Sequence, residues 1–222
     1  MKKLCVLVAV LFTMVMVHAQ EKKNDAKPED TSIARIKLAN QLAKYGYETF
    51  SASALIEAAQ ILSEVQTQKM DGIKYEQGKG EDVRKDNAPE VISITKLIKD
   101  AKEFADGDAT LLAMAEKVKT DNANTRGAVG GPKSGSNVVY GGTIDTYTIS
   151  FKKGVTAEIA VSGNGASDLD LYVYDENGNL IVGDEDYSDD CYVCWIPAWT
   201  GGFIVKVVNR GRYSNYYNIA TN

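Results

Sequence analysis

Histidine, cysteine and proline are scarce in this sequence, and their scarcity limits the chemistry that the protein can perform. The 222 residues include one histidine, three cysteines and four prolines. The single histidine, His18, lies in an N-terminal segment that we expect to be removed, which leaves the mature chain without imidazole. Such a chain cannot build a Ser-His-Asp triad, a Cys-His pair or a His-ligated zinc site. We therefore predict that the protein is not an enzyme, and a hydrolase that uses carboxylates alone is the remaining catalytic alternative.

The N-terminus has the pattern of a secretory signal peptide over residues 1–19. Lys2 and Lys3 give a short positive start, an apolar run follows from Leu4 to Val17, and small residues surround the cleavage position. The run is shorter than the roughly 20 residues that span a bilayer, and no later segment is apolar enough to do so. We expect an exported protein, periplasmic or extracellular, with a flexible leader over residues 20–30.

Charge is unevenly distributed along the chain. Loss of Lys2 and Lys3 leaves 23 basic residues against 30 acidic ones, which takes the net charge from −5 to −7. An acidic chain disfavours nucleic acid as a partner, because nucleic acid binds clustered Lys and Arg. Between Gly154 and Val205 there is no Lys or Arg, but there are ten carboxylates: Glu158, Asp168, Asp170, Asp175, Glu176, Asp184, Glu185, Asp186, Asp189 and Asp190.

Residues 31–120 carry apolar side chains at steps of three and four, the spacing of an amphipathic helix. Four helical segments are predicted from this period and from residues that cap helices. They begin near Thr31, Ser51 or Ser53, Asn87 with Pro89, and Asp108, and the first is expected to end at Gly46. Two helical pairs of this length predict a small antiparallel bundle.

Residues 121–137 have the composition of a linker, with Gly, Ser and Asn and a single Pro. Beyond it, apolar and polar residues alternate, and turn signals separate the runs, which predicts seven or eight short strands in a β-sandwich over residues 138–222. The fold class is therefore α+β in two separate parts, helical and then antiparallel β. The residues expected to face inward are Tyr147, Ile149, Phe151, Val155, Ala157, Ile159, Val161, Leu169, Leu171, Val173, Phe203, Val205 and Val207.

Four stretches of the C-terminal part are similar to one known family. They are SDLDLYVYDENGNLI, GDEDYSDD, WIPAWTGGFIVKVVNRG and the closing YSNYYNIATN. Over about residues 137–222 the chain resembles the bacterial pre-peptidase C-terminal domain family. The resemblance implies a jelly-roll-like sandwich that is appended to secreted proteins and acts in secretion, adhesion or substrate binding. The family often accompanies a peptidase, but the helical region here has no peptidase signature, so a protease role does not carry over.

The acidic residues offer a candidate cation site. Asp168 and Asp170 share one face of a predicted strand and lie about 7 Å apart at Cα. Carboxylates at this spacing can share a hard cation, and calcium takes six to eight oxygens. We predict a calcium site built from Asp168, Asp170, Asp184 and Asp186 that stiffens the surrounding loops. The alternative is an acidic, solvated rim that aids solubility and needs no cofactor.

Cys191 and Cys194 form a Cys-x-x-Cys motif. In an exported protein two such cysteines predict a local disulfide. The flanking residues favour a strand, on which positions i and i+3 point to opposite faces. A disulfide would therefore require a bulge or a tight turn between the two cysteines.

Aromatic residues supply the candidate ligand contacts. Trp199 lies before the turn Thr200-Gly201-Gly202, where burial is hard to arrange, and Tyr172 and Tyr174 are expected on the outer face of a strand. Aromatic rings stack on sugars or on the side chains of a partner. We predict Trp199, Tyr172 and Tyr174 as contact residues, whereas Trp195 and Tyr217 are expected in the core.

Together these features predict an exported, non-catalytic binding or accessory protein. Its partner is expected to be a protein or a polysaccharide at the cell envelope or outside the cell. The alternative is a secretion or structural accessory that acts on a partner protein through the helical region 31–120. The alanine-rich stripes of that region bury little area per helix, so another surface is expected to cover them.

Overall fold

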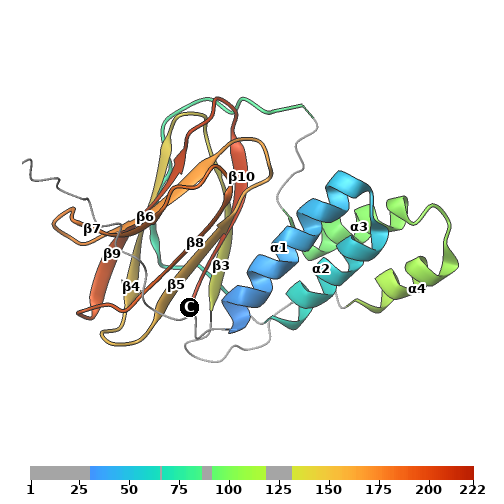
Figure 1. The fold of residues 1–222 in the computed structure, drawn as a ribbon, viewed down its shortest axis with the longest axis horizontal. Helices are drawn as coiled ribbons and strands as arrows, with labels where there is room; N and C mark the ends of the chain where they lie inside the picture. The colour runs from blue at the N-terminus through green and yellow to red at the C-terminus, as the bar shows by residue number, and fades with distance from the viewer. Residues whose placement is uncertain (1–30, 66, 87–91, 119–131) are drawn as a thin grey trace, which may run out of the picture.

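The structure, a computed structural model, describes residues 31–65, 67–86, 92–118 and 132–222. The predicted signal peptide, the predicted leader and residues 121–131 of the predicted linker lie outside these described residues. A β-sandwich of two sheets lies beside a group of four helices (Figure 1). None of the described helices combines the length and the apolar character that crossing a membrane requires.

The helices are α1 (Thr31–Thr49), α2 (Ala52–Glu64), α3 (Ile94–Phe104) and α4 (Ala109–Lys117). Each of the last three begins behind a side-chain oxygen that accepts hydrogen bonds from the first turn, which satisfies backbone N–H groups that have no partner within the helix. These caps are Ser51, Ser93 and Asp108. The predicted caps Ser51 and Asp108 are confirmed. The predicted start at Asn87 and Pro89 lies outside the described residues, and α3 begins only after Ser93.

The prediction that α1 ends at Gly46 is wrong, because the helix continues to Thr49. Gly46 is instead a point of close packing between α1 and α2. A Cβ atom at this position would lie 2.5 Å from Cδ2 of Leu55. The chain then turns at Phe50, which has a φ of 52°, and the N–H of Ser51 donates to the carbonyl of Gly46 at 2.9 Å.

The sandwich consists of two five-stranded sheets. Sheet A has the strand order β1-β3-β10-β5-β8, and sheet B has the order β2-β4-β9-β6-β7. All strand pairs are antiparallel except β1 with β3. The strands are β1 (Gln68–Lys69), β2 (Lys74–Glu76), β3 (Lys133–Val139), β4 (Ile144–Phe151), β5 (Ala157–Ser162), β6 (Leu169–Tyr174), β7 (Leu180–Asp184), β8 (Asp190–Trp195), β9 (Gly201–Asn209) and β10 (Asn215–Thr221). The α+β fold class is confirmed.

The alternating pattern correctly identifies the core between the sheets. Side chains predicted to face inward, such as Tyr147 on β4, Leu171 on β6 and Val205 on β9, are buried in one apolar cluster. Val155 is the exception, because it is 53% exposed. Its N–H still bonds to the carbonyl of Lys152, so Val155 belongs to the turn before β5 and not to a strand.

The segment between the two helical pairs takes part in both sheets. Strand β1 pairs with β3 in sheet A, and β2 pairs with β4 in sheet B. The predicted helical region 31–120 thus supplies an edge strand to each sheet, and the predicted linker 121–137 overlaps β3. Two strands of two and three residues are too short to show an alternating pattern, which is why the sequence did not predict them.

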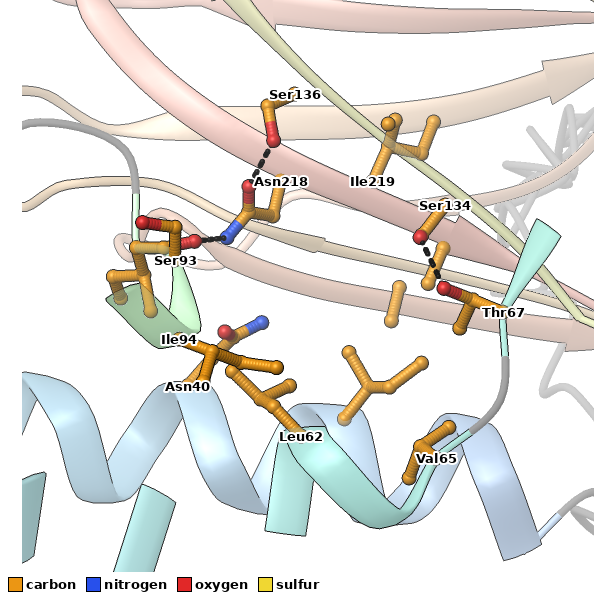
Figure 2. A pocket seen from close by; sticks show the side chains of 15 residues that line it. Asn40, Leu62, Val65, Thr67, Ser93, Ile94, Ser134, Ser136, Asn218 and Ile219 are labelled. Carbon is orange, nitrogen blue, oxygen red and sulfur yellow. Dashed lines mark hydrogen bonds between the residues drawn. The ribbon is translucent and has the colours of Figure 1, made fainter. Parts of the chain in front are cut away.

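One face of the sandwich is covered by α1, which packs against β5 and β10 of sheet A (Figure 1). The contact is apolar and joins Ile33 and Ile36 of α1 and Val65 to Ala160 and Ala220 on the sheet. The two alanines allow a close approach because their side chains are small. A cavity of about 250 Å³ remains in this junction (Figure 2).

Candidate functional site

The outer face of sheet B contrasts with the helix-covered face of sheet A. On β4 the outward residues Ile144, Thr148 and Ser150 are exposed, whereas the inward ones between them are buried. The strand registers place Thr146 of β4, Lys206 of β9, Tyr172 of β6 and Gly183 of β7 in one row, and Thr148, Ile204, Tyr174 and Leu180 in the next. These eight residues are called the sheet B face below.

Tyr172 is held rigidly on the sheet B face. Its hydroxyl donates to Asp170 at 2.9 Å and accepts from Arg210 at 2.8 Å, and Arg210 also pairs with Asp170. Burial, followed by the hydrogen bond to the Asp170 carboxylate, raises the pKa of Tyr172 to about 12. A Cβ atom at Gly183 would lie 2.9 Å from the Tyr172 ring, so glycine gives this ring room to lie against β7.

Tyr174 is the more accessible of the two predicted tyrosines. Its ring centroid lies 6.2 Å from that of Tyr172, and the Lys206 ammonium lies 4.7 Å from the Tyr174 centroid. Cation–π contacts of this kind hold both groups in place. Tyr174 is half-buried and Tyr172 is buried, so the structure brings the two predicted residues together but leaves only Tyr174 with substantial exposure.

Trp199 does not belong to this face. Its ring stacks on Phe203 with centroids 4.8 Å apart and planes 20° apart. Phe203 points inward and is fully buried, and Trp199 packs half-buried against the same core. A residue in a turn has no periodic pattern that predicts its direction, so the sequence could not show that Trp199 turns inward.

The ten carboxylates of the acidic stretch do not form one surface. Only Glu176, Glu185 and Asp186 are exposed, and the others are buried or half-buried. Asp170 pairs with Arg210, and Asp175 accepts N–H groups from Asn177 and Asn179 in the turn after β6. Most of these carboxylates therefore stabilise the fold instead of facing a ligand.

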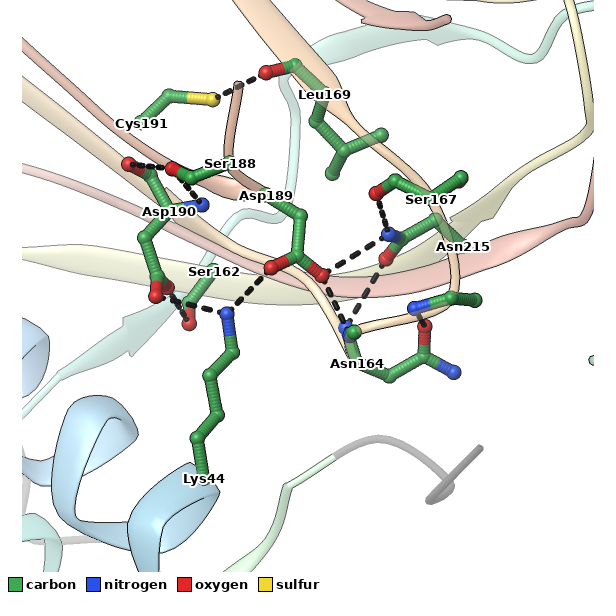
Figure 3. Close-up of polar contacts among 12 residues, drawn as sticks. Lys44, Ser162, Asn164, Ser167, Leu169, Ser188, Asp189, Asp190, Cys191 and Asn215 are labelled. Atoms are coloured by element: carbon green, nitrogen blue, oxygen red, sulfur yellow. Dashed lines mark hydrogen bonds and ion pairs between the residues drawn. The ribbon is translucent and has the colours of Figure 1, made fainter. Parts of the chain in front are cut away.

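Lys44 of α1 supplies much of the missing positive charge (Figure 3). Its Nζ lies 2.6 Å from Oδ1 of Asp189 and 2.8 Å from Oδ2 of Asp190. The second oxygen of Asp189 accepts the N–H of Gly165 at 2.5 Å and the Nδ2 group of Asn215 at 3.1 Å. This network fixes the end of α1 against the loop before β8. Charge counted within residues 154–205 misses Lys44, which lies 145 positions before Asp189.

The predicted calcium ligands interact electrostatically, but Asp170 and Asp184 are occupied by different partners. Asp170 pairs with Arg210, and Asp184 accepts N–H groups from Tyr192 and Asp186. Burial and then the charges of Asp170 and Asp186 raise the pKa of Asp168. Among the residues that the structure describes, no group of three or more Asp, Glu, Cys or His side chains is placed to hold a metal ion. The calcium site stays a prediction, and occupancy would raise the melting temperature in millimolar calcium.

The predicted disulfide between Cys191 and Cys194 is not formed in the structure, where both cysteines are buried thiols. They lie on β8, which is a regular strand paired along its length with β5. Cys191 faces the core between the sheets, where its thiol donates to the carbonyl of Leu169 at 3.1 Å. Cys194, three positions on, faces the opposite side of sheet A, because successive strand residues alternate.

We expect both thiols to resist modification in the folded protein, since burial raises the pKa of Cys191 and disfavours its reactive thiolate. Alkylation in denaturant without reductant, followed by mass spectrometry, should modify both cysteines. A peptide in which Cys191 and Cys194 are linked would contradict the structure.

Among known proteins, only solved structures are similar to this chain. No protein-family model matches the chain, and no curated protein matches it either. A pre-peptidase C-terminal domain of a collagenase from Bacillus anthracis is similar with a TM-score of 0.36 and 13% identity, over 40% of this chain and 87% of that one. The Yersinia pseudotuberculosis-derived mitogen is similar with a TM-score of 0.36 and 12% identity, over 42% of this chain and 86% of the mitogen.

A periplasmic inhibitor of g-type lysozyme from Aeromonas hydrophila has a TM-score of 0.31 and 15% identity, over 41% of this chain and 84% of that one. The first of these three structures belongs to the family that the sequence resembles. The likeness is one of fold, and at these TM-scores it says nothing about which residues of this chain act.

Proposed function

We propose that this chain is an exported, non-catalytic binding protein whose sheet B face holds a polysaccharide. The observation that carries the proposal is the asymmetry of the sandwich. Helix α1 covers the outer face of sheet A, while the outward residues of β4 in sheet B are exposed and lie beside a fixed pair of tyrosines. Side chains that are already held in place suit an extended ligand, because little side-chain freedom is lost when the ligand binds.

The chemistry of the sheet B face matches a sugar chain. A sugar ring has apolar C–H faces, which can pack on Tyr174 and Ile204, and hydroxyl groups around its edge. Thr146, Thr148 and Lys206 can form hydrogen bonds with these hydroxyls, because hydroxyl side chains donate and accept and an ammonium group donates. The face therefore places an apolar run of Ile204, Tyr174 and Leu180 beside the polar groups of Thr146, Thr148 and Lys206.

A titration with a panel of polysaccharides tests this proposal. Tyr174→Ala should raise the dissociation constant for a polysaccharide that binds by about tenfold. This is the loss of affinity expected when an aromatic residue that anchors a ligand is removed. Tyr187→Ala is the matched control, since Tyr187 is 100% exposed in the loop after β7 and lies outside the face. Equal affinity of the two variants would reject the sheet B face as the binding surface.

A second candidate function, docking of a partner protein on the helices, has one specific observation in its favour. Phe50 is 72% exposed at the α1–α2 turn, and Tyr45 and Leu38 are also exposed on α1. Leu38 and Tyr45 are seven positions apart and so share one face of α1, and exposed apolar side chains on one face are typical of protein-binding surfaces. Phe50→Ser would abolish binding of such a partner but leave polysaccharide binding unchanged, which distinguishes the two functions.

A further inference from the structure

The cavity at the junction of the helices and sheet A has the features of a small-molecule site. It is bounded by α1, by the end of α2, by the residues that lead into α3, and by β3, β5 and β10 (Figure 2). Its volume of about 250 Å³ equals that of about eight water molecules, at roughly 30 Å³ each. Sites for drug-sized ligands start at about 300 Å³, so a ligand here would contain little more than one ring.

The cavity wall combines apolar side chains with hydroxyl and amide groups, and none of the lining side chains that the structure describes is charged. Ile36, Leu62, Val65, Ile92 and Ile94 are among the apolar lining residues, and Ala160 and Ala220 leave space on the sheet side. Such a wall disfavours ions, because no charged side chain among the described lining residues balances their charge once their hydration is lost. It favours an uncharged ligand that has both an apolar body and a polar group.

Most polar groups of the wall already have partners. Ser136 donates to Asn218 at 2.6 Å, Asn218 donates to the carbonyl of Ile92 at 3.1 Å, and Ser134 donates to Thr67 at 2.8 Å. Ser93 accepts the N–H of Lys96 as the cap of α3. These bonds hold the wall in place and use the hydroxyl protons of Ser134 and Ser136, whose oxygens can still accept a hydrogen bond.

Asn40 is different from these residues. It is only 3% exposed, it lines the cavity from α1, and its Oδ1 has no hydrogen-bond partner among the described residues. A buried acceptor without a partner is destabilising, and asparagine is also unfavourable inside a helix. An apolar residue would pack better at this position, so Asn40 points to a ligand that supplies the missing bond.

We infer that this cavity binds an uncharged small alcohol or phenol, with the ring or alkyl body against the isoleucines and the hydroxyl on the Asn40 amide. A hydroxyl suits this amide because it can donate to Oδ1 or accept from Nδ2, whichever of them faces the cavity after rotation about χ2. The site lies against sheet A and is distinct from the sheet B face.

Phenol and toluene are matched probes, since phenol has a hydroxyl group where toluene has a methyl group. Titration of each into the full chain, followed through the methyl resonances of Ile36, Leu62 and Ile94, should show phenol bound about tenfold more tightly than toluene. Equal affinities would overturn the role of Asn40. The absence of shifts at these methyl groups with either probe would overturn the site itself.

Asn40→Leu provides a second test that also reports on the empty protein. The variant should lose the preference for phenol and bind toluene at least as well. Its melting temperature without probe should equal or exceed that of the wild type, because the unpartnered amide is gone. A lower melting temperature would show that Asn40 has a structural role instead, and the wild-type comparison of the two probes does not depend on the variant folding.

Discussion

Replacing Asp145 by alanine is expected to lower the free energy of unfolding by about 3–5 kcal/mol, because three buried or half-buried donors lose their acceptor at roughly 1–3 kcal/mol each. Asp145 is fully buried. It accepts hydrogen bonds from the hydroxyls of Tyr75 at 2.9 Å and Tyr217 at 2.8 Å, and from the N–H of Gly78 at 2.9 Å. The bonds from Tyr75 and Gly78 hold the β2 segment against the core. We therefore expect the pairing of β2 with β4 to be lost when Asp145 is replaced by alanine.

Asp145→Asn is the matched control, since the amide keeps the shape of the carboxyl and its oxygen, in the place of Oδ2, can still accept the bonds from Tyr75 and Tyr217. In urea denaturation, we expect Asp145→Asn to lower the free energy of unfolding by less than half as much as Asp145→Ala does. The same loss for both variants would contradict this expectation, because it would mean that the shape and the hydrogen bonding that asparagine keeps contribute nothing to stability.

The same carboxyl should give a pH-dependent signal. Burial raises the pKa of Asp145, and the bonds from Gly78 and Tyr217 offset only part of that rise. The folded state therefore binds this proton more tightly than the unfolded state. The contribution to stability is fully present below the unfolded pKa of about 3.9 and is lost as the pH rises through the higher folded pKa. The stability advantage of the wild type over Asp145→Asn should accordingly shrink from acid to neutral pH.

Replacing Lys44 by alanine should have the second-largest effect and lower the free energy of unfolding by about 2–4 kcal/mol. Removal of one partner of a buried ion pair costs about 3–5 kcal/mol, and the somewhat exposed side chains here reduce that figure. The side chain of Lys44 is 18% exposed and those of Asp189 and Asp190 are 11% and 23% exposed. Without the ammonium, two adjacent carboxylates at the edge of the sandwich repel each other.

The matched control is Lys99→Ala on α3. Lys99 lies 4.0 Å from Glu103, but both side chains are largely exposed, so the variant should change the free energy of unfolding by less than about 0.5 kcal/mol. Urea denaturation of both variants measures the difference. If Lys44→Ala proved as mild as Lys99→Ala, the network in Figure 3 would not hold α1 against the sandwich.

Local patterns in the sequence predicted the elements that depend on local physics. Alternation placed Tyr147, Leu171 and Val205 in the core, and hydroxyl and carboxyl caps located the starts of α2 and α4. The same alternation put Tyr172 and Tyr174 on one face, which the structure confirms.

Contacts between distant segments were not predictable in this way. Lys44 and Arg210 lie outside the acidic stretch in the sequence, yet they neutralise Asp189 and Asp170 within it. A count of charges within one window cannot include them. The short strands β1 and β2 depend on pairing with β3 and β4, and two or three residues have no period of their own.

The most direct test of polysaccharide binding by the sheet B face is a map of amide chemical shifts in the isotope-labelled chain. The polysaccharide to titrate is one that the panel identifies as a ligand. The account predicts shifts at Tyr174, Ile204 and Lys206 on the sheet B face, and none at Ala160 or Ala220 beneath α1. Shifts that gather on the helices or on the acidic loop after β7, with the sheet B face unchanged, would contradict it.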